Sequence, residues 1–170
     1  MMKLIRTLLA ALALIAVLGI TTQQRAAAQG NATIQARATI QAALTVTAAR
    51  DLNFGTVTAG IPGGFAVGVT TPAAGQWNMT GEGNLGVSLT FMLPSELTGT
   101  GTPVPISGWQ ALASPSSTPS GTPFTPTSGT AVSKFLSGGA LWVFIGAIIT
   151  PPVGSSGNYS APIMLTVAYL

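Results

Sequence analysis

The chain has 170 residues with six basic and three acidic side chains, no cysteine and no histidine. Without cysteine and histidine it cannot form Ser-His-Asp or Cys-His nucleophilic sites, nor the common zinc sites. It also cannot form disulfides, so a folded domain must be stabilised by its own core.

Residues 1–28 have the pattern of a cleavable secretory signal peptide. Lys3 and Arg6 precede an apolar stretch from Leu8 to Ile20, and the run Ala26-Ala27-Ala28 offers an A-x-A cleavage site. The apolar stretch is shorter than the ~20 residues that a membrane-spanning helix needs. We therefore expect export, cleavage after Ala28, and no stable membrane span afterwards.

Cleavage changes the charge of the protein, because it removes three of the six basic residues. Three basic and three acidic residues remain in the mature chain, whose net charge is then zero; they are Arg37, Arg50, Lys134, Asp51, Glu82 and Glu96. No basic patch remains for nucleic acid, and three scattered carboxylates do not suit calcium. We expect no nucleic-acid partner, no metal site and no cofactor.

The first strand-like stretch alternates from Ala32 to Ala48, with apolar residues at even positions and mostly Thr and Gln at odd positions. One strand of this length would extend about 56 Å at ~3.3 Å per residue, which exceeds usual strands. We divide it into an N-terminal alternating strand at 29–41, a possible donor strand, and the first core strand of a domain at 42–170. The even residues of the first part are candidate subunit contacts: Ala32, Ile34, Ala36, Ala38 and Ile40.

Shorter alternating runs follow between Gly and Pro residues, at 51–57, 65–69, 76–80, 87–91 and 159–169. The continuous apolar run Ala140–Ile149 is typical of a strand buried on both sides or at a subunit contact. A Pro/Thr/Ser/Gly-rich loop or insertion is expected at about 97–130, with one short strand near Ile106 to Ala111. The period of two predicts an all-β fold: an immunoglobulin-like two-sheet sandwich of about seven to nine strands, preceded by a signal peptide helix.

Few residues offer chemistry. A glycosidase needs two facing carboxylates, but Asp51 follows Arg50 and Glu82 lies in a Gly-rich turn. We therefore expect that the protein is not an enzyme. Trp109 lies in the loop-rich region, which makes it a candidate for an exposed ligand contact.

Several segments resemble the bacterial domain-of-unknown-function family 4402, and the resemblance covers most of residues 38–170. The matching segments are 43–57, 77–81, 138–143 and 157–169, of which the last is the most specific. The resemblance implies an exported β-sandwich of Gram-negative-type bacteria with no established activity. The chain also looks like pilin and fimbrial adhesin domains, whose last strand carries a penultimate tyrosine. Tyr169 occupies that place and is a further candidate subunit contact, although the cysteine pair of chaperone–usher pilins is missing.

Two functional interpretations follow from these patterns. In the first, the protein is a structural or adhesive subunit of a surface filament, joined head to tail when residues 29–41 add as a strand to another copy. A periplasmic chaperone and an outer-membrane assembly protein are then further candidate partners. In the alternative, a self-contained secreted sandwich binds a carbohydrate or surface polymer near Trp109. Either protein would reside in the periplasm, on the cell surface or in an extracellular filament.

Overall fold

The computed structural model describes residues 30–170, so the predicted signal peptide lies outside the described residues. All regular elements of the described part are strands, arranged in two antiparallel sheets, which confirms the all-β prediction. The ten strands are β1 Thr45–Arg50, β2 Phe65–Val67, β3 Gly75–Thr80, β4 Gly86–Met92, β5 Glu96–Gly99, β6 Val104–Ser114, β7 Ala131–Phe135, β8 Ala140–Ile149, β9 Tyr159–Ser160 and β10 Met164–Tyr169. In residues 30–170 no helix has the length and apolar character required to cross a membrane.

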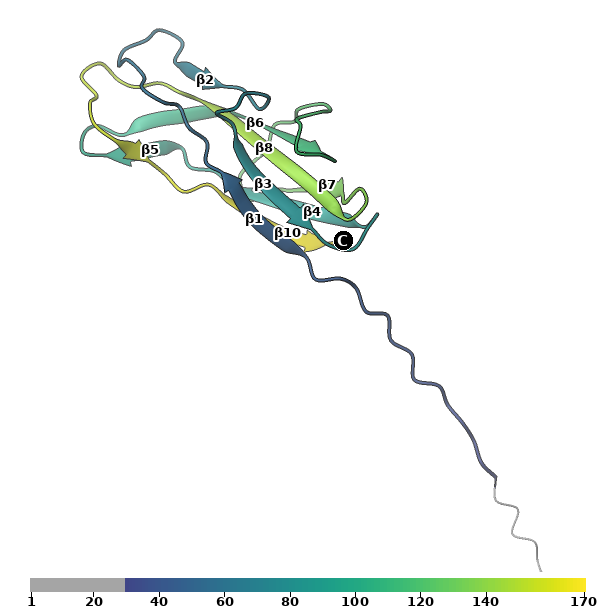
Figure 1. Cartoon of the computed structure of the whole chain (residues 1–170). Coiled ribbons are helices and arrows are strands. Elements are labelled where there is room, and N and C mark those ends of the chain that lie inside the picture. Colours follow the sequence, from purple (N-terminus) through teal and green to yellow (C-terminus); the bar gives the residue numbers. More distant parts are fainter. Residues whose placement is uncertain (1–29) are drawn as a thin grey trace, which may run out of the picture. The chain divides into compact units, whose positions relative to one another are not determined.

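The larger sheet has seven strands in the order β1-β3-β8-β6-β5-β9, with β2 as a further partner of β8 (Figure 1). The strand β8 lies at its centre. One edge of β8 pairs with β3 and then β2, and the other edge pairs with β6. The continuous apolar sequence of β8 follows from this position, because Val143 and Ile145 pack on one face of the sheet and Phe144 on the other.

The smaller sheet has three strands in the order β10-β4-β7. The alternation predicted for residues 87–91 is confirmed, because Val87, Leu89 and Phe91 are fully buried. These side chains pack against Met79 of β3 and the inward residues of β8, so the main core lies between the two sheets.

A second core cluster is covered partly by a loop and partly by side chains of β5, β6 and β9. Val104, Ile106, Ala147 and Ile149 of the larger sheet pack against a set of half-buried side chains: Leu52, Phe54, Val57, Leu97, Trp109 and Tyr159. The strand expected at 51–57 does not form. Gly55 has a left-handed φ of 66°, and its N–H donates to Asn53 Oδ1 at 2.8 Å. The chain turns at these residues instead of extending.

The loop or insertion predicted at about 97–130, with one short strand near Ile106 to Ala111, contains more strand than expected. It contains most of β5 and all of β6, an 11-residue strand paired with β8. Between Ser107 and Gln110 the β6–β8 register shifts, and Gly108 takes a φ of 60°. This β-bulge and the Pro residues weaken the alternation on which the prediction relied. The strand β7 is a further element that the sequence analysis does not predict.

The N-terminal alternating strand predicted at 29–41 is not a strand in this chain over its described residues. Residues 30–44 carry no strand assignment and are exposed apart from Leu44, and Ile34 and Ile40 are 94% and 91% exposed. A strand needs a partner for its backbone groups, and residues 30–41 have no strand partner in the described part of the chain. The strand begins at Thr45, where β1 pairs with β3.

Candidate functional site

In residues 30–170 the larger sheet ends at β1 and β9 and the smaller sheet ends at β10 and β7, so the edges of β1 and β10 are among those without a strand partner. Within residues 30–170, β1 at the end of the larger sheet pairs only with β3, and β10 at the end of the smaller sheet pairs only with β4. Each edge therefore leaves a row of backbone N–H and C=O groups without a strand partner. Such edges are templates for pairing with another chain.

These two edges face the same side of the sandwich and run in opposite directions (Figure 1). At one end, Tyr169 of β10 bonds to Ala42, just before β1. At the other end, Ile163, just before β10, lines the same pocket as Ala48 and Asp51. We call the space between β1 with residues 51–57 and β10 with residues 155–163 the β1–β10 groove.

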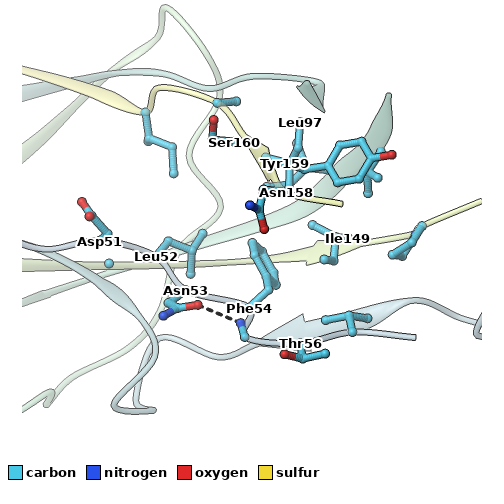
Figure 2. A pocket seen from close by; sticks show the side chains of 18 of the residues that line it. Asp51, Leu52, Asn53, Phe54, Thr56, Leu97, Ile149, Asn158, Tyr159 and Ser160 are labelled. Atoms are coloured by element: carbon cyan, nitrogen blue, oxygen red, sulfur yellow. Dashed lines mark hydrogen bonds between the residues drawn. The ribbon is translucent and has the colours of Figure 1, made fainter. Parts of the chain in front are cut away.

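The open half of the groove is a pocket of about 940 Å³. Its floor is apolar and includes Trp77, Ile106, Ile145 and Ile149. Figure 2 shows how the two flanking segments approach it, with the Phe54 ring and the Asn158 amide pointing toward one another and the Tyr159 ring turned away. Arg50 and Asp51 are the only charged residues that line it, and uncharged polar residues such as Asn53 and Asn158 share the lining with the apolar ones, so an uncharged occupant with both polar and apolar groups fits.

The exposure of β1 shows that part of the core lacks a cover. The β1–β3 register pairs Val46 with Met79 and Ala48 with Trp77, so both β1 residues face the core side. Every residue of β1 is nevertheless exposed, and Val46 is 37% exposed. On the opposite wall, Leu165 and Val167 are only half-buried although they pack against the core. These side chains leave part of the core between the two sheets accessible.

A hydrogen-bonded cluster closes the other end of the groove. The Tyr169 hydroxyl donates to the Ala42 carbonyl at 2.9 Å and accepts from the Glu82 N–H at 2.6 Å. The Ala42 N–H donates to Glu82 Oε2 at 3.1 Å. Gly81 is required here, because the Tyr169 hydroxyl and Leu44 occupy the space of a side chain. We call these three residues, Ala42, Glu82 and Tyr169, the Tyr169 clamp.

The structure places the predicted site residues in different settings. Ala32, Ile34, Ala36, Ala38 and Ile40 are all exposed, and Tyr169 lies at the closed end of the groove. Trp109 is not in a loop: it lies in the bulge of β6, half-buried and packed against both main core clusters. The prediction missed the wall residues 51–57 and Glu82, whose partners come from distant parts of the sequence.

The described residues show no arrangement typical of catalysis or metal binding. No group of three metal-ligating side chains occurs within residues 30–170. Asp51 lines the groove, Glu82 belongs to the clamp, and Glu96 is exposed on β5. These positions do not present two carboxylates to one substrate.

Comparison with known proteins finds no matching family model, no matching curated protein and no matching solved structure. The resemblance to domain-of-unknown-function family 4402 therefore stays a prediction.

Proposed function

We propose that this protein is an exported structural or adhesive surface protein, a pilin-like filament subunit with an immunoglobulin-like sandwich fold. Residues 32–40 of one copy would add as a strand in the β1–β10 groove of the next copy. The proposal is carried by two features that occur in one chain. The edges of β1 and β10 have no strand partner and flank an incompletely covered core, and an alternating segment before β1 has no strand partner either.

The segment is long enough to run along β10, and its chemistry suits the groove. Residues 32–40 span about 30 Å when extended, and the six residues of β10 span about 20 Å, at ~3.3 Å per residue. The even residues are three Ala and two Ile, and the groove floor includes the apolar side chains of Trp77, Ile145 and Ile149. Backbone hydrogen bonds to both edges would supply affinity, while alternate side chains would fill the space over the core.

Strand addition of this kind uses different surfaces on the two partners. A head-to-tail contact does not close on itself unless its rotation forms a ring, and otherwise it builds a filament. It also gives a reason for keeping two open edges, which are otherwise an aggregation hazard. A periplasmic chaperone that occupies the groove before assembly and an outer-membrane assembly protein would be the natural partners.

Deletion of residues 29–41 tests the proposal. The deletion should yield monomers that expose the groove and form no filaments by electron microscopy. A peptide of residues 30–42 added in trans should bind these monomers, whereas a peptide with residues 32–40 in scrambled order should not. Normal filaments from the deleted chain would refute the proposal.

The alternative of a self-contained secreted sandwich gains one observation from the structure. The pocket brings the amides of Asn53 and Asn158 near the Phe54 ring, and convergent polar groups over an apolar floor are typical of small-molecule sites. A carbohydrate or surface polymer would then bind there instead of at Trp109. Size-exclusion chromatography of the mature protein separates the two functions, because a stable monomer favours the alternative and a ladder of oligomers favours the filament.

A further inference from the structure

The groove and the segment proposed to fill it belong to one chain, so a subunit has the means to fill its own groove. Residues 41–44 join the segment to β1. Hairpin loops of 2–5 residues are sufficient to reverse a chain. A tethered strand also competes at an effective concentration of about millimolar. Self-filling would pair residues 32–40 with β1 and leave the subunit unable to accept another copy.

The Tyr169 clamp lies where that reversal would have to occur. In the clamp, both backbone polar groups of Ala42 are hydrogen-bonded: the N–H donates to Glu82 and the carbonyl accepts from Tyr169. Two residues further on, Leu44 is half-buried and packs against the main core. The connection between the segment and β1, residues 41–44, is therefore held at Ala42 and at Leu44. Residues 39–44 contain no turn.

A hairpin at 41–44 would require the clamp to open. The carbonyl and N–H of Ala42 would leave their partners, and Leu44 would be pulled from the core. The Tyr169 hydroxyl and the Glu82 carboxylate would then lose two solvent-exposed hydrogen bonds to residues 41–44, and the loss of the Leu44 contact with the core would add to that cost. No such cost applies to a strand that arrives from another copy.

We propose that the Tyr169 clamp is a stop that prevents the segment before β1 from entering its own groove, and so reserves the groove for a second copy of the chain. This inference rests on the proposed strand addition. The clamp joins three distant parts of the sequence, the connection before β1, the turn after β3 and the last residue of β10. It can therefore form only once the two sheets have assembled, which is when the groove first exists.

The test uses the full mature chain and removes the clamp without removing core side chains. Tyr169→Phe keeps the ring that packs against the core, and Glu82→Ala changes a half-buried residue in a turn. Glu96→Ala is the matched control, because Glu96 is an exposed carboxylate outside the clamp and the groove lining. Each variant is compared with the wild type by amide hydrogen exchange at residues 32–40 in the monomer fraction, and by the oligomer yield.

In the wild-type monomer, residues 32–40 should exchange freely, and the chain should assemble. In Tyr169→Phe/Glu82→Ala, we expect at least tenfold slower exchange at residues 32–40 of the monomer and a several-fold lower yield of oligomers. Either single variant should shift both readouts in the same direction, so Glu82→Ala serves if the double variant does not fold. The control Glu96→Ala should match the wild type.

Two outcomes overturn the inference in distinguishable ways. If the clamp variants fold and assemble like the wild type, with freely exchanging residues 32–40 in their monomers, the clamp is not a stop while strand addition stands. If the wild type itself never assembles, the strand-addition proposal fails and the inference fails with it.

Discussion

Replacing Ile34 and Ile40 by Ala should weaken subunit association far more than it changes the stability of the subunit. Both side chains are almost fully exposed in the single chain, so their loss removes nothing from its core. In the groove they would be the largest side chains that residues 32–40 contribute. Each Ile→Ala change removes three carbon groups at about 0.8 kcal/mol each, so about 2.4 kcal/mol is lost per site.

That loss corresponds to a roughly 50-fold weaker association for one variant and roughly 3,000-fold for both, at ~1.4 kcal/mol per tenfold. Sedimentation equilibrium of the mature chain measures the association constant, and urea unfolding of the monomer should differ by less than ~0.5 kcal/mol. Gln35→Ala is the control, because its side chain lies on the opposite face of the alternating segment. Equal effects from Gln35→Ala and Ile34→Ala would refute a groove-filling role for the even positions.

Three further predictions concern the fold itself and are all measured by urea unfolding of the monomer. Trp109→Ala should lower the free energy of unfolding by about 3 kcal/mol, because the indole packs against two core clusters. A loss below ~1 kcal/mol together with lost glycan binding would instead support a ligand role for Trp109. Tyr159→Phe should leave stability unchanged or raise it by up to ~1 kcal/mol, since the buried hydroxyl has no hydrogen-bond partner within the described residues; a loss above that amount would show an unseen partner. Gly146→Ala should lower the free energy of unfolding by about 1–3 kcal/mol, because the added Cβ would collide with the Val67 carbonyl. Gly68→Ala is the control, because its Cβ would meet only Thr71 Cγ2 at 3.8 Å. Equal stability of the two variants would contradict the close approach at Gly146.

The elements whose apolar pattern is uninterrupted were predictable from the sequence: β3 and β4 from alternation, and β8 from a continuous apolar run. The residues of β3, β4 and β8 have clear patterns, and their inward residues are buried as expected. The prediction failed where backbone geometry interrupts the pattern. Gly55 turns the chain after Phe54, and the bulge at Gly108 shifts the parity of β6. Nothing in the sequence around Gly55 or Gly108 distinguishes these glycines from the many glycines in ordinary turns.

Only those parts of the candidate site that lie within one continuous segment were predictable from the sequence. The alternating face at residues 32–40 can be identified from a single segment, and Tyr169 follows from the last strand. The groove depends on which strand edges remain unpaired, and the clamp depends on a contact between Ala42, Glu82 and Tyr169. Such long-range contacts leave no periodic signal in one sequence, so the sequence alone indicates only that Glu82 lies in a Gly-rich turn.

Directed disulfide formation tests strand addition most directly, because the chain contains no cysteine of its own. Ala36→Cys in one batch of mature protein would be mixed with a second batch carrying Cys on β10, at either the inward Val167 or the outward Thr166. In a sheet, residues paired across neighbouring strands share a face. The proposal predicts that cysteines at even positions of the segment, Ala36 or Ala38, link to Val167→Cys and form mixed dimers, with little linkage to Thr166→Cys. Filaments that form normally while neither position links, or while both link equally, would contradict it.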